Sequence, residues 1–220
     1  MISKEILDGD FCVFQDDDLY KFTSDAILLS KFVKAKKNEV VADFCAGSGI
    51  VGLNFFALNK NLVKSLSFFE VQTPFCHLIT KSVEENQIQD KCKVINTKIQ
   101  DIKKEEYEKF SLILCNPPYF KPVDSQKAQN LSVKIAREEV LLSQEELISM
   151  ASKCLKFGGR LVMVHIVDRL VDVISLMRKN GIEPKRLQFI SAKNKEPYLF
   201  LVEGAKGGKS GLKVLKNGEN

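Results

Sequence analysis

The NPPY motif (Asn116-Pro117-Pro118-Tyr119) constrains the fold most strongly, because it must end a strand. The apolar run 110–115 leads directly into it. Two consecutive prolines have no N–H group to donate to a sheet, so a central strand cannot continue through them. A strand that stops at Asn116 leaves an amide side chain, the Pro117 carbonyl and an aromatic ring at its carboxyl end. Ligands bind at that edge of open α/β sheets, although Asn-Pro also makes ordinary turns.

A glycine-rich turn lies earlier in the chain, between a predicted strand and a predicted helix. The apolar run 40–44 ends in Asp43-Phe44, the turn Cys45-Ala46-Gly47-Ser48-Gly49 follows, and residues 50–58 are apolar nearly all round. Glycines let a ligand approach the backbone, and a helix N-terminus presents free N–H groups. The turn is not a phosphate loop, because it contains no G-K-[ST]. Asp43 would repel a pyrophosphate but suits a cation, such as the sulfonium and ammonium groups of S-adenosylmethionine.

Strand and helix patterns alternate along most of the chain. Seven strands and about six helices are predicted, and only a short link separates the last two strands. This order indicates an α/β fold with a Rossmann-like, seven-stranded, doubly wound sheet that is mostly parallel and ends in an antiparallel hairpin. Glu70 ends the second strand about twenty residues after the glycine turn, where an acid can accept hydrogen bonds from ribose hydroxyls. The alternative is a charge at the N-terminus of the helix that begins at Thr73-Pro74.

The length and composition indicate one globular domain with a small excess of basic residues. The 220 residues suit a single domain with a small appendage, and 33 Lys and Arg against 28 Asp and Glu give a net charge of +5. We expect an N-terminal extension over residues 1–36, a catalytic domain over 37–204 and a basic tail over 205–220. The glycine pair Gly158-Gly159 is expected to end the helix that follows the capping box of Ser143 and Glu146.

Cysteine usage and hydropathy point to a cytoplasmic location. The six cysteines form no C-x-x-C pair, so we expect reduced thiols and neither a zinc site nor a disulfide framework. We also expect no metal. No apolar run reaches the length of about 20 residues that a membrane-spanning helix needs, and the first five residues do not resemble a signal peptide.

Two basic stretches are candidates for contact with a polyanion. The first is the irregular segment 120–137, and the second is the glycine- and lysine-rich tail, whose alternative is a frayed, solvated terminus. Guanidinium groups suit phosphate, so Arg137 ranks first, with a salt bridge to a helix carboxylate as its alternative. The expected RNA contacts are Phe120, Lys121, Lys134, Arg137, Lys206 and Lys209.

Taken together, these motifs resemble a known family. The turn Asp43–Gly49 with the NPPY motif is similar to the class I S-adenosylmethionine-dependent methyltransferases that modify exocyclic or amide nitrogens. More closely, the chain resembles the bacterial family that methylates N6 of the adenine 3′ of the valine tRNA anticodon. That similarity rests on segments across nearly the whole chain: Phe22–Ser30, Ile135–Glu139, Ile182–Arg186 and Val202–Gly208.

The resemblance implies a cofactor site and a substrate. S-adenosylmethionine would be the cofactor and tRNA the partner, with Asp25 near the amino acid end of the cofactor and Glu70 at its ribose. Methyl transfer would occur at Asn116, Pro117, Pro118 and Tyr119. The cofactor site would comprise Asp25, Asp43, Phe44, Cys45, Ala46, Gly47, Ser48, Gly49, Glu70, Val71, Lys98, Ile99 and Asn116.

One position departs from the family. An acidic residue usually follows the third strand and accepts a hydrogen bond from the cofactor adenine, whereas Lys98 stands there. A lysine only donates, so this contact would pass to the backbone around Ile99 or to Asp101.

Three other functions remain open from the sequence. The same tetrapeptide serves enzymes that methylate a guanine amine in ribosomal RNA or a glutamine amide in a protein. Lys98 is also compatible with a catalytically silent RNA-binding relative.

Overall fold

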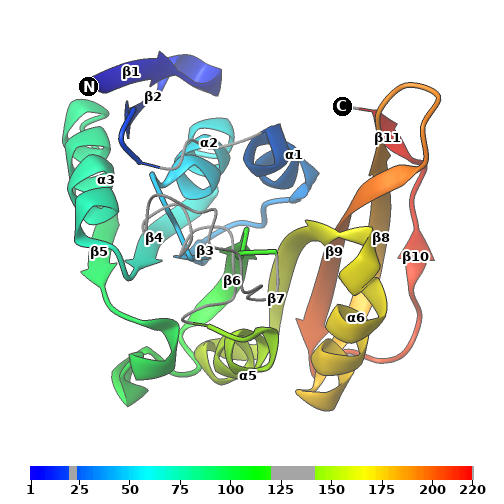
Figure 1. The fold of residues 1–220 in the computed structure, drawn as a ribbon. Helices are drawn as coiled ribbons and strands as arrows, with labels where there is room; N and C mark the ends of the chain where they lie inside the picture. Colours follow the sequence, from blue (N-terminus) through cyan, green and yellow to red (C-terminus); the bar gives the residue numbers. More distant parts are fainter. Residues whose placement is uncertain (20–23, 120–141, 220) are drawn as a thin grey trace, which may run out of the picture.

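The computed structural model describes residues 1–19, 24–119 and 142–219. In these residues a nine-stranded sheet has helices on both faces (Figure 1), with the strand order β10-β8-β9-β7-β6-β3-β4-β5, and β11 pairs with β8 as well. The principal strands are β3 (Glu39–Phe44), β4 (Val63–Glu70), β5 (Cys92–Asn96), β6 (Phe110–Cys115), β7 (Leu155–Ile166), β8 (Ile182–Ser191) and β9 (Pro197–Lys206).

The strand directions confirm the predicted fold class. β5, β4, β3, β6 and β7 are parallel to one another, whereas β9 lies antiparallel between β7 and β8. The structure adds two short strands to the predicted seven, β10 (Lys213–Val214) and β11 (Gly218–Glu219), which pair with β8. The segment 205–219 therefore joins the main sheet, and the proposed division of the chain into three parts stays a prediction.

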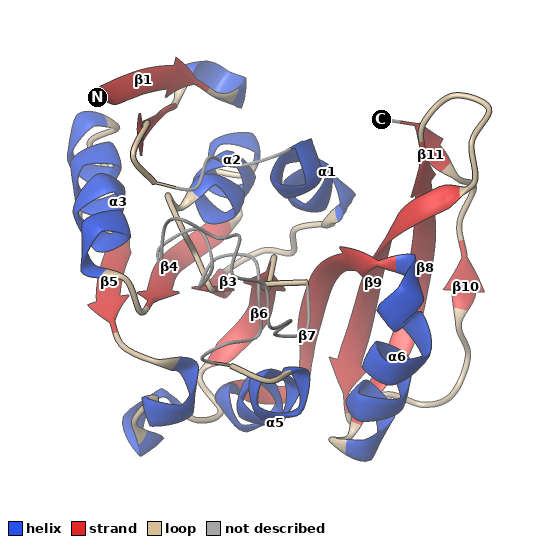
Figure 2. Ribbon diagram, in the orientation of Figure 1, coloured by secondary structure: helices blue, strands red, loops and turns tan. Residues whose placement is uncertain are grey.

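Helices cover the two faces of the sheet (Figure 2). One layer contains α1 (Ser24–Phe32), α2 (Ile50–Leu58) and α3 (Thr73–Glu85), and the other contains α5 (Gln144–Cys154) and α6 (Leu170–Lys179). Alternate residues of each strand face opposite layers, as the pleat requires. Thus Val41 and Leu112 belong to one buried cluster, and Ala42 and Ile113 to the other. A separate hairpin of β1 (Ile2–Ile6) and β2 (Cys12–Asp16) packs beside α3.

The helix α5 begins as predicted but ends earlier. Ser143 and Glu146 form the expected capping box. Gly158-Gly159 does not end the helix, because α5 stops at Cys154 and β7 starts at the next residue. The two glycines lie in a bulge of β7 instead, where Gly158 has a φ of 74° and a Cβ on Gly159 would lie 2.8 Å from the carbonyl oxygen of Lys156. Close backbone approach, not helix termination, explains this pair.

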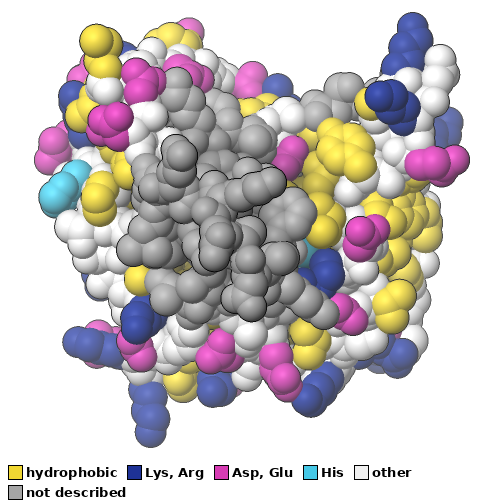
Figure 3. Space-filling model, viewed as in Figure 1, with side chains coloured by type: hydrophobic (Ala, Val, Ile, Leu, Met, Phe, Trp, Pro, Cys, Tyr) yellow, Lys and Arg dark blue, Asp and Glu magenta, His cyan; other side chains and the backbone are white. Residues whose placement is uncertain are grey.

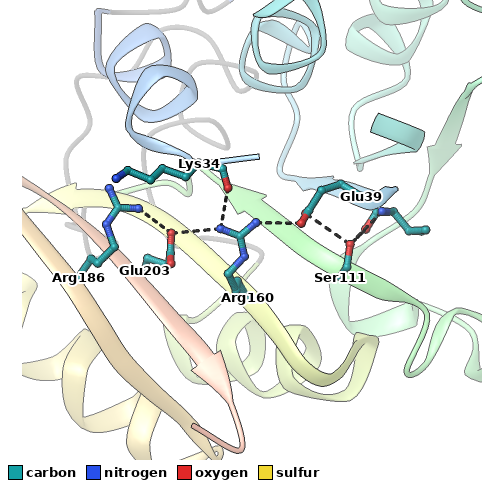
Figure 4. Close-up of polar contacts among 7 residues, drawn as sticks. Lys34, Glu39, Ser111, Arg160, Arg186 and Glu203 are labelled. Carbon is teal, nitrogen blue, oxygen red and sulfur yellow. Dashed lines mark hydrogen bonds and ion pairs between the residues drawn. The ribbon is translucent and has the colours of Figure 1, made fainter. Parts of the chain in front are cut away.

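A buried ionic network ties α1 to the sheet (Figure 4). Arg160, which is 4% exposed, donates from its two terminal nitrogens to Glu39 at 3.0 Å, to Glu203 at 3.4 Å and to the Lys34 carbonyl at 2.9 Å. Arg186 donates to the same Glu203 carboxylate at 2.9 Å and to the Phe32 carbonyl at 3.3 Å. The two arginines therefore hold the carbonyl groups at and just after the end of α1.

All six cysteines are free thiols, and four of them are buried. No helix in the described ranges is long and apolar enough to cross a membrane.

Candidate functional site

The glycine turn (Cys45–Gly49) and the NPPY motif emerge next to each other at one edge of the sheet. β3 and β6 are parallel neighbours, and Phe44 pairs with Cys115 at the last position of both strands. β4 and β5 lie beyond β3, whereas β7 lies beyond β6, so the chain changes its direction of winding between these strands. The two motifs therefore flank a topological switch point, where open α/β sheets bind ligands.

The glycines of this region are needed for different structural reasons. Gly47 has a φ of 54°, and a Cβ built on it would meet no atom within 4 Å, so a ligand can approach its backbone. Gly49 has a φ of 81° and packs against Ile79 and Phe68. Gly52, to which the sequence assigned no role, would place a Cβ only 2.7 Å from the Phe68 ring. The signal in the sequence was its spacing, because Gly47, Gly49 and Gly52 fit G-x-G-x-x-G, whose third glycine allows close packing of helix on strand.

Two buried carboxyl groups lie beside the turn. Asp43 is 1% exposed, its Oδ2 accepts a hydrogen bond from the Gly52 N–H at 2.9 Å, and its Oδ1 has no partner among the described residues. Burial raises the pKa of Asp43 well above its ordinary value; the Gly52 N–H lowers this pKa, and the charge of Glu70 raises it. No Lys or Arg within the described ranges pairs with either carboxylate. The pair is therefore short of positive charge, which fits a cationic ligand.

Glu70 closes the glycine turn onto the end of β4. It is 6% exposed, and its Oε2 and Oε1 accept hydrogen bonds from the N–H groups of Gly47 and Gln72, both at 2.8 Å. Burial raises the pKa of Glu70, while these N–H groups lower it. Each carboxylate oxygen keeps a lone pair that can accept from a ribose hydroxyl. The ribose contact of Glu70 stays a prediction.

The residues expected near the cofactor adenine follow the neighbouring strand ends. Glu70 pairs with Asn96, so Val71 and Lys98 lie just beyond the ends of β4 and β5. Lys98 is exposed, and its carbonyl accepts a hydrogen bond from the Asp101 N–H at 3.1 Å, whereas Ile99 is buried in the core. With Lys98 exposed and the Ile99 side chain buried, backbone groups around Ile99 and the Asp101 side chain remain the expected contacts, and this expectation stays a prediction.

The structure brings Asp25 to the NPPY motif. The Tyr119 hydroxyl lies 2.6 Å from the side-chain oxygen of Asn116 and 3.3 Å from Oδ2 of Asp25, which belongs to the first turn of α1. Pro117 is buried, while Asn116, Pro118 and Tyr119 are half-buried. Asp25 therefore contacts the predicted catalytic motif directly, 94 positions away in the sequence.

His165 supports the Tyr119 ring, and the sequence did not predict this contact. The two ring centroids are 5.0 Å apart, and His165 is 0% exposed near the end of β7. Its Nδ1 accepts from the Ile166 N–H at 2.9 Å, and its Nε2 lies 2.6 Å from the Gln144 amide group. Burial lowers the pKa of His165 to about 4, so the ring is neutral at pH 7. His165 therefore provides a packing surface for the Tyr119 ring and carries no charge.

Two of the six expected RNA contacts, Lys206 and Lys209, lie in the described residues, and they are not at this edge. Phe120, Lys121, Lys134 and Arg137 lie outside the described residues. Lys206 lies at the opposite edge of the sheet, because its neighbour Ala205 pairs with Arg160, which in turn pairs with Leu112 near the start of β6. The Lys206 ammonium group donates a hydrogen bond to the Leu155 carbonyl at 2.8 Å. Lys209 follows it closely in the chain, and its carbonyl accepts from Lys185.

The turn between β8 and β9 lies at the NPPY edge instead. Ile166, at the end of β7, pairs with Leu199 in β9, so residues 192–196 project beyond the site edge. This turn carries the exposed Lys193 and Lys195, and Lys and Arg side chains are visible at this corner of the molecule (Figure 3). Sequence periodicity placed the strands but gave no indication that this turn would lie at the same edge of the sheet as the site.

Known proteins are similar to this chain in sequence and in fold. The methyltransferase small domain family matches residues 10–179. A tRNA1(Val) (adenine(37)-N6)-methyltransferase of Parabacteroides distasonis is 23% identical over 181 residues, which are 82% of this chain and 74% of that protein. A release factor glutamine methyltransferase of Clostridium botulinum is 21% identical over 157 residues, 68% of this chain and 54% of that protein. The structure of a predicted O-methyltransferase from Agrobacterium tumefaciens has a TM-score of 0.68 at 19% identity and covers 88% of this chain and 86% of that one.

The family match extends over most of the chain and includes both motifs. The pair of buried carboxyl groups and the open backbone at Gly47 fit the sulfonium cofactor of that family. The chain belongs to the methyltransferase small domain family and is an S-adenosylmethionine-dependent methyltransferase.

Proposed function

We propose that this methyltransferase modifies the exocyclic 6-amino group of an unpaired adenine in the anticodon loop of a tRNA. The observation that carries the proposal is the position of the NPPY motif beside the glycine turn, at the ends of adjacent parallel strands. The relative from Parabacteroides distasonis, named for methylation of adenine 37 in a valine tRNA, supports the choice of substrate.

The motif supplies what an aromatic amine needs in order to react. The lone pair of the 6-amino group is delocalised into the adenine ring, which makes the nitrogen a poor nucleophile. The Asn116 side-chain oxygen and the Pro117 carbonyl each accept one N–H of that group. These two contacts fix the nitrogen and draw it toward tetrahedral geometry, and positioning of this kind can contribute on the order of 7–11 kcal/mol.

The residues of the glycine turn and the neighbouring strand ends hold the cofactor. S-adenosylmethionine supplies a methyl group that is already activated by its positively charged sulfur. Asp43 provides the negative charge, Gly47 the backbone approach and Glu70 the acceptors for the ribose. The adjoining contacts come from Phe44, Cys45, Ala46, Ser48, Gly49, Val71, Lys98 and Ile99.

No side chain has to remove a proton before methyl transfer. Burial holds the Cys115 thiol protonated by raising its pKa well above the ordinary value, and both nitrogens of the buried His165 have partners. The amine becomes cationic and acidic only after the transfer, so its proton can then leave to water. Tyr119 stacks on the extruded base, a contact worth about 1–3 kcal/mol.

Incubation with radiolabelled S-adenosylmethionine and total RNA from a strain that lacks the protein tests this proposal. We expect label in N6-methyladenosine of the tRNA fraction after digestion. Label in guanosine would overturn the adenine assignment while leaving an RNA as the substrate. Absence of label in RNA, with cofactor binding confirmed by ligand-induced thermal stabilisation, would overturn the RNA assignment.

A protein glutamine amide is the second candidate acceptor. The similarity to the release factor glutamine methyltransferase of Clostridium botulinum favours it, although the chain spans about half of that protein. An amide nitrogen also has a delocalised lone pair, so it needs the same two hydrogen-bond acceptors, the Asn116 side-chain oxygen and the Pro117 carbonyl. Labelling of a purified release factor, with none in tRNA, would select this function.

A further inference from the structure

The acceptor oxygen that the target amine needs is occupied in the structure. The Tyr119 hydroxyl lies 2.6 Å from the side-chain oxygen of Asn116, a short distance for a hydrogen bond in which a hydroxyl donates to an amide oxygen. In the proposed function this Asn116 oxygen accepts an N–H of the substrate. The phenol must therefore release that oxygen before the nitrogen can be aligned.

A second acceptor is within reach of the same hydroxyl. Oδ2 of Asp25 lies 3.3 Å from the Tyr119 oxygen, at a longer distance than the Asn116 oxygen. A hydroxyl has one proton, so it can make only one strong donation at a time. A carboxylate is a stronger acceptor than an amide oxygen, so a small rotation of the phenol toward Asp25 would replace the lost hydrogen bond.

We propose that Asp25 is a positioning residue that takes over the Tyr119 hydroxyl when the target amine takes the Asn116 oxygen. The inference rests on the proposed function of Asn116. It assigns Asp25 to the acceptor side of the reaction, whereas the resemblance to known families implied a place near the amino acid end of the cofactor.

The surroundings hold both partners in place for this exchange. His165 packs against the Tyr119 ring and is itself held by Ile166 and Gln144, so the ring has a buried support while its hydroxyl changes partner. Asp25 lies on α1, and Arg160 and Arg186 hold the carbonyl groups at the C-terminal end of that helix. Neither acceptor has to move far, because both already lie within 3.3 Å of the phenol oxygen.

A double-mutant cycle tests the exchange. Four proteins are compared by kcat/KM for the RNA at saturating S-adenosylmethionine: wild type, Asp25→Ala, Tyr119→Phe and the double variant. We expect Asp25→Ala to lower kcat/KM about five- to tenfold, because the phenol then stays on Asn116. Adding Tyr119→Phe should recover most of that loss, because the competing hydroxyl is gone while the aromatic ring remains.

Two outcomes would overturn the inference. The first is that Asp25→Ala lowers kcat/KM by the same factor in the wild-type background and in the Tyr119→Phe background. Equal factors with and without the hydroxyl would show that Asp25 acts independently of Tyr119. The second is a loss of cofactor affinity that accounts for the whole effect, measured by calorimetry, which would return Asp25 to the cofactor site.

Asp25→Asn is the matched control, because its amide oxygen can still accept the hydroxyl. We expect this variant to lie between the wild type and Asp25→Ala, and equal thermal midpoints would show that all variants are folded. If tRNA is not the substrate, the same cycle is run with whichever acceptor the labelling identifies. A wild-type protein that labels no acceptor would overturn the proposed function and this inference together, whereas equal factors in an active protein overturn the inference alone.

Discussion

The backbone N–H of Gly52 donates a hydrogen bond to Oδ2 of Asp43 across 2.9 Å, while the other oxygen of this carboxylate is buried without a partner in the described residues. The contact joins the end of a strand to the first turn of the following helix, since Asp43 lies in β3 and Gly52 in α2. A buried carboxylate with one satisfied oxygen destabilises the ligand-free protein. Its presence at the glycine turn is therefore explained best by a cationic ligand.

We expect Asp43→Asn to separate stability from cofactor binding. The amide oxygen can still accept the Gly52 N–H, but the negative charge is lost, so affinity for S-adenosylmethionine should fall about tenfold or more. The thermal midpoint of the ligand-free protein should stay level or rise, because a desolvated charge has been removed. Calorimetric titration and thermal unfolding measure the two effects, and undiminished affinity would contradict the role given to Asp43.

We expect Asn116→Ala to remove nearly all turnover while leaving cofactor binding largely intact. Loss of one acceptor for the reacting nitrogen should lower kcat on the order of 10²–10³-fold, by analogy with the removal of a single transition-state hydrogen bond. The control is Asn61→Ala, because Asn61 is exposed just before β4 and far from the NPPY edge. Comparable activity of Asn116→Ala and wild type would remove Asn116 from the mechanism.

Two double variants, each lacking one pair of lysines, compare how much the two edges of the sheet contribute to RNA binding. The double variant Lys193→Ala/Lys195→Ala removes two charges at the edge of the sheet that carries the site, and Lys206→Ala/Lys209→Ala removes two at the opposite edge. We expect the first to weaken RNA binding and to reduce the slope of log affinity against log salt by up to about 1.4, and the second to leave that slope unchanged. The reverse result would support the RNA contacts that the sequence predicts at Lys206 and Lys209.

His165 should make the folded state sensitive to acid. Its folded pKa of about 4 lies below the unfolded value of 6.5, so the unfolded chain binds the proton first as the pH falls. The contribution of His165 to the free energy of unfolding is fully present above pH 6.5. It falls by about 3 kcal/mol as the pH is lowered toward 4. Denaturant unfolding of wild type and His165→Phe at about pH 7 and about pH 4.5 measures this difference, and an equal loss in both proteins would contradict it.

Local sequence was sufficient for the parts of the fold that depend on neighbouring residues. Apolar runs and turn residues predicted seven strands of the main sheet, and the pair of prolines predicted where β6 ends, because these effects act within a few residues. The glycine turn was identified for the same reason. Gly158-Gly159 shows the limit of this reasoning, since a glycine pair is equally compatible with a helix end and with a bulge, and only the approach of Phe110 and Lys156 distinguishes them.

The sequence by itself therefore determined the α/β order, the switch-point motifs and the class of cofactor that they suit. Tertiary structure decided which distant side chains meet there. Asp25 reaches Tyr119 across 94 positions and Arg160 reaches Glu39 across 121, and no local pattern encodes such contacts. The edge at which each lysine lies also depends on strand pairing, because β9 runs antiparallel to β7 and so carries Lys206 to the edge opposite the site, while the turn before β9 lies at the site edge.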